Sequence, residues 1–200
     1  MEIAYLIPPI AYLLGSVPFG YILVRSAEGE DIRKSGSGNI GATNVYRKSR
    51  WAGVLTLLLD AGKGYLAVLV AERLGEGDVW PGVAAMCAIL GHVFTVWLRF
   101  KGGKGVATGC GAYLALAPLA VATTLAAFVL VLALTRYISA ASIAATALFP
   151  LWAWLYAYPS PVVLWAALGG LLIIAKHHQN IRRLLARTEN KFSLGGKRAP

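Results

Sequence analysis

The sequence predicts an all-α integral membrane protein with a single membrane-embedded domain over residues 1–200. Of its residues 58% are hydrophobic and 14% are charged, whereas soluble domains have about 25% charged residues. Apolar runs recur from one end of the chain to the other, which leaves no stretch for a separate soluble domain. Several runs approach the length of about 20 residues at which a helix crosses the hydrocarbon core of a bilayer.

Seven apolar segments are predicted to be transmembrane helices, because the breaks between them carry Pro, Gly or charged residues. The segments cover approximately residues 3–24, 51–71, 80–98, 106–117, 119–135, 138–156 and 162–175. The fourth segment is short, since a helix of about 12 residues covers only about 18 Å. We therefore expect about seven transmembrane helices, one of them short.

The basic residues predict the orientation, because Lys and Arg gather in cytoplasmic loops. If segment 106–117 spans on its own, the basic C-terminal tail lies inside and Arg73 is the one basic loop residue outside. If it merges with the next segment, Arg136 and the tail both lie outside. The first alternative fits better, with the N-terminus out and the C-terminus in. Three polar regions then share the cytoplasmic face: residues 25–50, residues 99–105 and the tail from residue 176.

The formal net charge of +10 has the same explanation, because the basic residues lie between apolar spans. No aromatic-rich RNA-binding motif accompanies them, so we expect no nucleic-acid partner. The two cysteines, Cys87 and Cys110, lie in apolar surroundings without the spacing of metal ligands. We expect neither a metal site nor a disulfide framework.

The first polar region contains RKSGSGNIGATNVYRKSR, in which Gly36, Gly38 and Gly41 form a G-x-G-x-x-G pattern. This pattern indicates dinucleotide binding only inside a strand–helix–strand unit, which is absent here. Glycines allow positive φ, so successive backbone N–H groups can turn inward and form an anion-binding nest. The alternative is a flexible polar loop. Side chains that can add donors to a nest are Ser35, Ser37, Asn39, Thr43, Asn44 and Arg47.

The second polar region reads RFKGGKGVATG and differs from a Walker A motif, because Gly105 follows Lys104. A helix is expected to begin near Val106, and its first N–H groups would favour a phosphate beside Lys101 and Lys104. The alternative is a cytoplasmic loop whose glycines only make turns.

The third polar region reads KHHQNIRRLLARTE, and helical spacing places His177, Asn180 and Leu184 on one face with Arg183 nearby. This face suits acid–base chemistry or anion binding. A juxtamembrane amphipathic helix that binds acidic lipid headgroups is an equally good interpretation of this segment alone.

Polar residues also occur within the predicted spans, where they normally face a cavity or each other. Asp60 and Lys63 lie three residues apart, which predicts an intrahelical ion pair. Arg136 with Ser139 and Ser142 can form a polar wall toward the inner site. Residue His92 lies near the end of its span.

The segments SGSGNIGATNVYR, GHVFTVWLRFKGGKGVAT and HHQNIRRLLARTE together resemble the three motifs of the bacterial membrane acyl-phosphate:glycerol-3-phosphate acyltransferase family. TRYISAASI and LLDAGKG are similar to further stretches of that family, so the resemblance covers nearly the whole chain. Two positions depart from it: Arg187 stands where the family usually has Gly, and Thr95 where Pro is common.

The resemblance implies transfer of a fatty acyl group from acyl phosphate to the 1-hydroxyl of glycerol 3-phosphate, giving lysophosphatidic acid and phosphate, the first step of phospholipid synthesis. It implies no cofactor, no metal, no acyl-CoA and no acyl carrier protein. It also implies a multi-pass protein of the bacterial plasma (inner) membrane, with its active site at the cytoplasmic face and an upstream supplier of acyl phosphate. Partners are then acyl phosphate, glycerol 3-phosphate and membrane lipid.

With this resemblance, we expect the three polar regions to form one site. The expected catalytic residues are His177, Lys104, Arg47 and Asn180. The expected substrate-binding residues are Ser37, Asn39, Thr43, Asn44, Lys101, Gly102, Gly103, Gly105, Ser139, Ser142 and Arg183. Residues 102–105 are expected to cradle a phosphate.

The proton of the attacking hydroxyl passes either to a phosphate oxygen of the substrate, which we favour, or to His177. No Ser-His-Asp arrangement indicates a covalent acyl intermediate. Two other functions remain in view: a transporter for phosphate or an organophosphate, which the absence of an obvious inverted repeat disfavours, and a lipid-binding scaffold.

Overall fold

The computed structural model describes residues 2–192, and within this range the regular secondary structure is helical, with no strand. The 3₁₀ helices are η1 (Glu2–Leu6), η2 (Ile32–Lys34) and η3 (Val96–Leu98). The α-helices are α1 (Ile7–Ser16), α2 (Phe19–Glu28), α3 (Ala42–Lys48), α4 (Arg50–Leu74), α5 (Val79–Val93), α6 (Val106–Leu116), α7 (Pro118–Thr135), α8 (Ile138–Leu155), α9 (Ser160–Ala175) and α10 (His178–Leu185). The expectation of an all-α membrane protein is confirmed. The basic tail residues Lys197 and Arg198 lie outside the described range.

Helices occupy all seven predicted apolar segments, but in segment 80–98 α5 already ends at Val93, and η3 follows after the non-helical residues Phe94 and Thr95. Within residues 2–192, five stretches are long and apolar enough to cross a membrane: Ile3–Glu28, Arg50–Leu74, Val79–Leu98, Pro118–Thr135 and Ile138–Leu155. A sixth is possible by length if α9 and α10, which meet at an angle of 57°, count as one broken span. Helix α6 has 11 residues and is the short apolar helix that the sequence predicts. Seven crossings and the orientation of the termini stay predictions.

The first span is broken where the sequence analysis expects a continuous helix. The break falls at Val17 and Pro18, between α1 and α2. Proline has no N–H to donate and disfavours the helical conformation of the residue before it, and Val17 has ψ 116°. The break leaves the carbonyl of Val17 available to a side chain from another helix.

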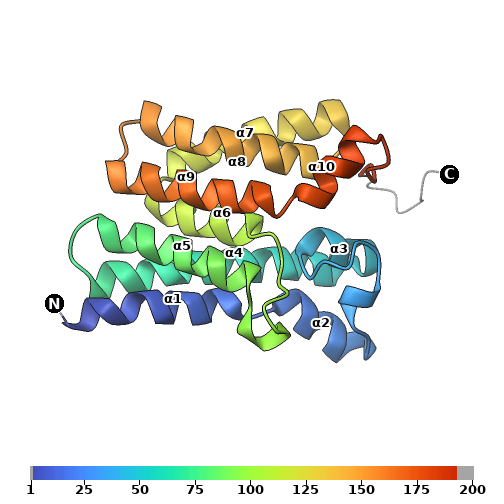
Figure 1. Cartoon of the computed structure of the whole chain (residues 1–200), viewed down its shortest axis with the longest axis horizontal. Coiled ribbons are helices and arrows are strands. Elements are labelled where there is room, and N and C mark those ends of the chain that lie inside the picture. Colours follow the sequence, from blue (N-terminus) through green and yellow to red (C-terminus); the bar gives the residue numbers. More distant parts are fainter. Residues whose placement is uncertain (1, 193–200) are drawn as a thin grey trace.

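The helices form two layers with α6 between them (Figure 1). One layer contains α1, α4 and α5, and the other contains α7, α8 and α9. Helix α4 packs along α6, α1 along α5, and both α7 and α9 along α8. Helix α7 is the least enclosed candidate span, with 11% of its residues buried inside the protein.

Small residues allow α4 and α6 to approach closely, as is usual between membrane helices. A Cβ atom on Gly64 would lie 2.0 Å from the carbonyl oxygen of Thr108, and one on Gly111 would lie 1.9 Å from that of Ala61. Both contacts involve backbone, which cannot rotate away. The path of α6 therefore depends on these glycines.

Replacing Gly64 with alanine is expected to lower the free energy of unfolding by about 1–3 kcal/mol, because the methyl group overpacks this contact. Gly62 on the same helix is the matched control, since nothing lies within 4 Å of an added Cβ there. Gly62→Ala should leave the protein as stable or more stable, by up to about 1 kcal/mol, through helix propensity. Thermal unfolding in one detergent measures both, and equal midpoints would contradict the close approach.

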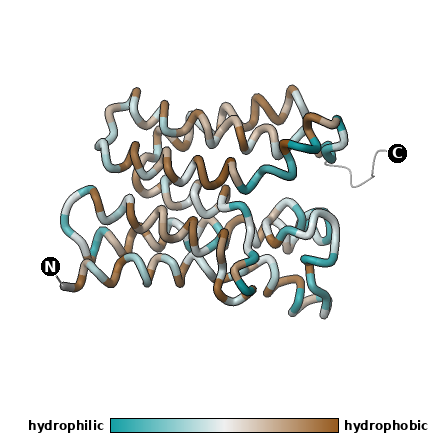
Figure 2. The backbone as a smooth tube through the Cα atoms, viewed as in Figure 1, coloured by the Kyte–Doolittle hydropathy of each residue, from teal (hydrophilic) through white to brown (hydrophobic). Residues whose placement is uncertain are grey.

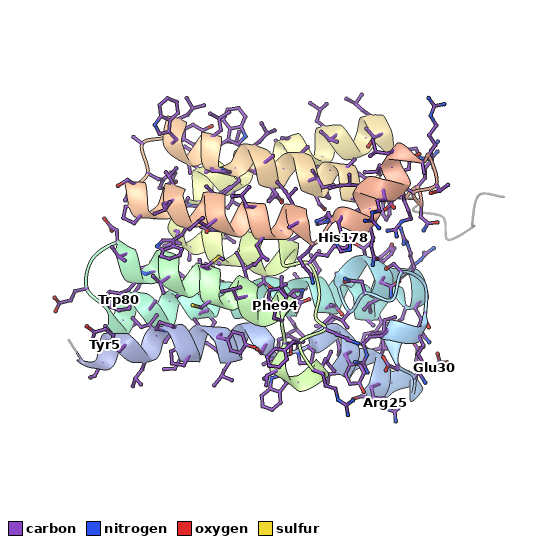
Figure 3. The ribbon with its side chains drawn as sticks, viewed as in Figure 1. Tyr5, Arg25, Glu30, Trp80, Phe94 and His178 are labelled. Carbon is purple, nitrogen blue, oxygen red and sulfur yellow. The ribbon has the colours of Figure 1, made fainter. Side chains whose placement is uncertain are left out.

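Hydrophilic residues gather at the end of the molecule that holds α3 and α10, whereas apolar residues dominate the long helices (Figure 2). Large apolar side chains point outward from those helices, including Leu134 and Leu171, which are 76% and 67% exposed. At the opposite end Tyr5 and Trp80 meet edge to face with ring centroids 5.9 Å apart (Figure 3). An apolar girdle with aromatic residues near its edge is typical of a protein embedded in a bilayer.

Candidate active site

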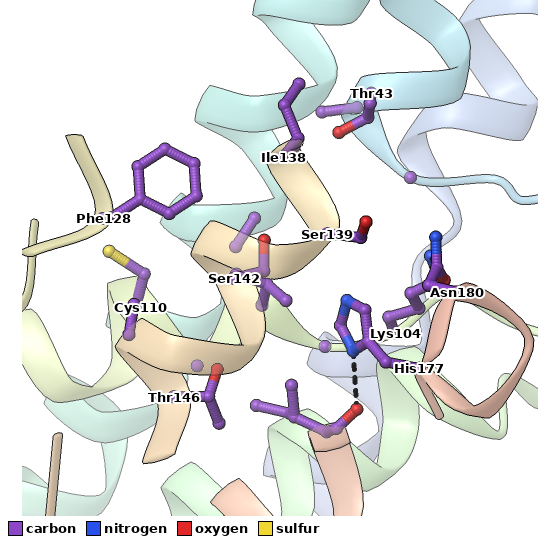
Figure 4. A pocket seen from close by; sticks show the side chains of 18 of the residues that line it. Thr43, Lys104, Cys110, Phe128, Ile138, Ser139, Ser142, Thr146, His177 and Asn180 are labelled. Carbon is purple, nitrogen blue, oxygen red and sulfur yellow. Dashed lines mark hydrogen bonds between the residues drawn. The ribbon is translucent and has the colours of Figure 1, made fainter. Parts of the chain in front are cut away.

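A cavity of about 350 Å³ opens among α3, α6, α7, α8, α9 and α10. Its polar part contains side chains from all three polar regions, and its apolar part extends between the spans. The polar side chains that line it include Ser37, Asn39, Thr43, Asn44, Arg47, Lys104, Ser139, Ser142, His177, Asn180, Arg183 and Glu189. In Figure 4, Lys104, His177 and Asn180 lie near Ser139 and Ser142, while Cys110 and Phe128 lie farther along the pocket. The expected meeting of the three regions is confirmed.

A chain of hydrogen bonds joins Lys104 to the polar end of α10. Lys104 Nζ donates to Asn180 Oδ1 at 2.5 Å, and Asn180 Nδ2 donates to Glu189 Oε1 at 2.7 Å. Glu189 also accepts from Ser139 Oγ at 2.9 Å and from Arg183 Nε at 2.6 Å. Its carboxylate therefore connects α8, α10 and, through Asn180, the loop before α6.

Glu189 is a site residue that the sequence analysis does not include, although it ends the third motif. It reaches the cavity because the chain reverses at Arg187, whose φ is 57°. The N–H groups of Arg187 and Thr188 donate to the carbonyls of Leu184 and Arg183, which closes the end of α10. Glycine adopts positive φ most easily, which would suit the glycine that the family resemblance leads one to expect at this position. Arginine permits the same turn here.

Burial raises the pKa of Glu189, but hydrogen bonds from Arg183, Asn180 and Ser139 outweigh it, so the pKa lies below its usual value. Burial lowers the pKa of Lys104 to about 8, with Glu189 opposing the shift and Arg183 and Arg47 adding to it. Lys104 is thus largely protonated at pH 7. Three cations face one carboxylate in this part of the cavity, which gives it the positive potential that phosphate requires.

His177 is buried, and burial lowers its pKa to about 4, so it is neutral near pH 7. Its Nδ1 lies 2.8 Å from the carbonyl oxygen of Ile173 (Figure 4). A carbonyl can only accept, so Nδ1 carries the proton and Nε2 is left as an acceptor. A neutral His177 in this tautomer is suited to accept a hydrogen bond from a hydroxyl group.

The first polar loop is ordered by Asn44, and this changes the expected role of that residue. The Asn44 side chain accepts from the N–H of Ser37 at 2.9 Å and donates to the carbonyls of Ser35 and Asn39 at 3.0 and 2.9 Å. Asn39 Oδ1 likewise accepts from the N–H of Gly41 at 2.8 Å. The Asn44 amide therefore holds the loop together and is not a free donor for a phosphate, whereas the loop engages only the oxygen of the Asn39 amide.

Gly36 and Gly38 have φ of 58° and 70°, which is the conformation for which the sequence analysis expects glycine. The loop surrounds the Asn44 amide instead of leaving an open nest. Its contributions to the cavity include the side chains of Ser37, Asn39, Thr43 and Arg47.

The expected phosphate cradle also needs correction. Gly102 and Gly103 donate their N–H groups to the carbonyls of Val93 and His92 at 3.1 and 3.0 Å, because the loop returns onto the end of α5. Neither residue lines the cavity, and nor does the exposed Lys101. Lys104, Gly105 and the start of α6 at Val106 do line it, where the sequence predicts a helix to begin.

The polar residues predicted within the spans divide into two groups. Asp60 and Lys63 form the expected ion pair, with 2.8 Å between Oδ1 and Nζ. Ser139 and Ser142 line the cavity, but Arg136 does not. Arg136 ends α7 with φ 63°, and its carbonyl accepts from the N–H of Phe192 at 2.6 Å.

The deeper part of the cavity is apolar and is lined by α6, α7, α8 and α9. Tyr113 of α6 and Phe149 of α8 pack with ring centroids 4.8 Å apart, while Leu125 and Phe128 of α7 line the side toward the lipid. A cationic entrance joined to an apolar arm fits a molecule with a phosphate head and a hydrocarbon tail.

The chain matches the family model described as glycerol-3-phosphate acyltransferase over residues 5–187. It is 49% identical to the glycerol-3-phosphate acyltransferase of Geobacter sulfurreducens over 92% of this chain and 94% of that protein. It is 51% identical to that of Trichlorobacter lovleyi over 91% and 94% of the two chains.

Two crystal structures of PlsY (YgiH), an integral membrane glycerol 3-phosphate acyltransferase, have the same fold. The glycerol 3-phosphate form has a TM-score of 0.90 and 38% identity, covering 95% of this chain and 96% of the other. The lysophosphatidic acid form has a TM-score of 0.88 and 36% identity, covering 95% of each chain. The similarity extends over nearly the whole length, so this chain belongs to the glycerol-3-phosphate acyltransferase family.

Proposed function

We propose that the protein transfers a fatty acyl group from acyl phosphate to the 1-hydroxyl of glycerol 3-phosphate, giving lysophosphatidic acid and inorganic phosphate. The observation that carries this proposal is the single cavity in which a cationic end continues into an apolar arm. Related proteins named for acylation of glycerol 3-phosphate, and a structure with bound lysophosphatidic acid, support it.

In this proposal Arg47, Lys104 and Arg183 hold the phosphate groups, and the hydroxyls of Ser37, Thr43 and Ser142 add donors around them. The start of α6 supplies unpaired N–H groups. The tail of the acyl donor occupies the apolar arm near Tyr113 and Phe149. Bound in this way, the acceptor hydroxyl and the acyl carbon meet at the junction of the two parts.

The reaction needs one bond to form and one to break. The hydroxyl oxygen of glycerol 3-phosphate attacks the acyl carbon, and the bond from that carbon to the phosphate oxygen breaks. Phosphate is a good leaving group, so orientation and stabilisation of the anionic oxygens can supply most of the rate enhancement. Ser139 donates its hydrogen bond to Glu189 and is not paired with His177, which speaks against an acyl-serine intermediate.

The proton released by the hydroxyl passes to a phosphate oxygen of a substrate. Phosphate monoesters lose their second proton near pH 6, whereas the pKa of His177 is about 4. The phosphate is therefore the stronger base, and His177 Nε2 orients the hydroxyl. We expect His177→Gln to retain more activity than His177→Ala. A loss of several orders of magnitude in kcat in both variants would contradict this assignment and favour His177 as the base.

The assay that tests the function mixes the purified protein with acyl phosphate and labelled glycerol 3-phosphate, without CoA or acyl carrier protein. Labelled lysophosphatidic acid is the expected product. Acyl-CoA in place of acyl phosphate tests the donor, and product formed only with acyl-CoA would overturn it. Uptake of labelled glycerol 3-phosphate into vesicles without acylation would favour a transporter.

We also propose that the polar end faces the cytoplasm at the plasma (inner) membrane of a bacterium, with seven crossings. The basic loops support this orientation. Glu76→Cys and Arg182→Cys place exposed thiols at opposite ends of the molecule. A membrane-impermeant thiol reagent should label only the Glu76→Cys variant in intact cells, with the wild type as control. Labelling of the Arg182→Cys variant from outside would reverse the orientation.

A further inference from the structure

A charged cluster that the proposed reaction does not use lies beneath the loop that carries Lys104. It consists of Asp60 and Lys63 from α4 and His92 from α5, which are 2%, 5% and 4% exposed. Asp60 Oδ1 lies 2.8 Å from Lys63 Nζ and 3.6 Å from His92 Nδ1. Asp60 and His92 also reach the wall of the cavity. Ionisable groups inside a membrane protein are costly to bury and mark functional positions.

On one side the cluster is tied to the break in the first span. Lys63 Nζ donates to the carbonyl oxygen of Val17 at 2.7 Å and lies 5.7 Å from the ring centroid of Phe19. The Val17 carbonyl is available because Pro18 interrupts the helix there. Lys63 thus neutralises Asp60 and links α4 to the junction of α1 and α2.

On the other side the cluster supports the glycine-rich loop. The carbonyls of His92 and Val93 accept the N–H groups of Gly103 and Gly102. The His92 ring lies so close beneath the loop that a Cβ atom on Gly103 would be 2.0 Å from its Nε2. The Nδ1 edge of the same ring is the one nearest to Asp60. Asp60 and Gly103 therefore contact opposite edges of one imidazole.

We propose that Asp60, Lys63 and His92 form a positioning unit for Lys104: Asp60 orients the His92 ring, and the ring sets the path of Gly103 and so the place of the Lys104 ammonium. This inference rests on the proposed function. Lys104 Nζ reaches across the cavity to Asn180 at 2.5 Å, so a small displacement of its backbone changes its distance to a bound phosphate. The three residues act through Lys104.

Two substitutions separate positioning from general stability. His92→Ala removes the support beneath Gly103. Val68→Ala is the matched control, since Val68 is fully buried on α4 in the apolar core and belongs to no part of the site. Both should destabilise the fold, but only His92→Ala should lower kcat/KM for glycerol 3-phosphate per folded molecule, by about 10²-fold, the size of effect expected for a misplacement of about 1 Å.

A double-mutant cycle with Lys104→Met tests whether His92 acts through Lys104. In the Lys104→Met background, His92→Ala should cause less than about a twofold further loss, because the misplaced group is already gone. A merely structural role predicts the same fold-loss in both backgrounds, and that result would overturn the inference.

The pH profile gives a second readout that does not depend on the residual activity of Lys104→Met. Deprotonation of Lys104 should lower kcat/KM at alkaline pH. A loosened Lys104 is better hydrated, which raises its pKa, so this alkaline fall should move to higher pH in His92→Ala and stay in place in Val68→Ala. An unmoved limb in His92→Ala would contradict the inference. Absence of product from the wild type would instead contradict the proposed function, so the two failures are distinguishable.

The charges of the cluster are tested by the double substitution Asp60→Asn with Lys63→Met, which removes both and leaves no unpaired buried ion. It should lower kcat/KM in the wild-type background and have little further effect when Lys104→Met is present. A kcat/KM equal to that of the wild type in this double variant would show that the ion pair does not orient His92.

Discussion

Lys104→Met is expected to lower kcat/KM for glycerol 3-phosphate by about 10²- to 10³-fold, the largest loss from any single substitution in the cavity. Removing one partner of a buried charge-assisted hydrogen bond costs about 2–5 kcal/mol. Lys104 shares its surroundings with Arg47 and Arg183, so loss of one cation should not destabilise the fold. Steady-state kinetics with a thermal unfolding control separate the two effects.

The charge of Lys104 also predicts a pH dependence. Its pKa is about 8, and in the proposed function the protonated form binds phosphate, so kcat/KM should fall as the pH rises through about 8. Lys104→Arg keeps the positive charge well above this pH, because the guanidinium group stays protonated throughout the accessible pH range. This variant should lose the alkaline limb while retaining part of the activity. An alkaline limb that persists unchanged in Lys104→Arg would assign it to another group.

Glu189→Gln is expected to lower the free energy of unfolding by about 3 kcal/mol and to reduce activity as well, because it leaves Arg183 without a counter-charge. The Glu189 side chain is 6% exposed and accepts from Ser139, Asn180 and Arg183. The neutral amide can replace only part of these contacts. Glu76→Gln, in the exposed loop at the other end, is the control and should leave stability unchanged.

Low pH should reduce the free energy of unfolding of the wild type, because it protonates the same Glu189 carboxylate. The folded pKa of Glu189 lies below its usual value of 4.5, so its stabilisation is fully present above about pH 4.5 and is lost as the pH falls through the folded pKa. The stability difference between wild type and Glu189→Gln should therefore narrow below about pH 4.5. A difference that is constant from pH 7 to pH 3 would mean that the charge of Glu189 does not stabilise the fold.

Local features of the chain are the ones that the sequence predicts well. Apolar length locates the seven helical segments, and a spacing of three residues predicts the Asp60–Lys63 pair. The start of α6 at Val106 follows from the glycines before it. Each of these features depends on contacts within a few residues, which periodicity and spacing describe directly.

The partners of backbone groups are the features that the sequence does not predict. Whether the Gly102 and Gly103 amides face a ligand depends on where the loop meets α5, and that is a tertiary contact. The commitment of the Asn44 amide to its own loop is of the same kind. Glu189 reaches the cavity only because Arg187 adopts positive φ, which the residue type does not suggest.

The sparse enclosure of α7 bears on how a lipid product departs. If the hydrocarbon tail left through the cationic end of the cavity, it would be exposed to water. This exposure would cost roughly 0.8 kcal/mol of transfer free energy per methylene group, or about 12 kcal/mol for a chain of about 15 such groups. The side formed by Leu125 and Phe128 borders the bilayer instead, because the helix that carries them is the least enclosed of the candidate spans. A tail that slides past α7 exchanges one apolar surrounding for another, so only the phosphorylated head has to leave the protein toward the aqueous boundary.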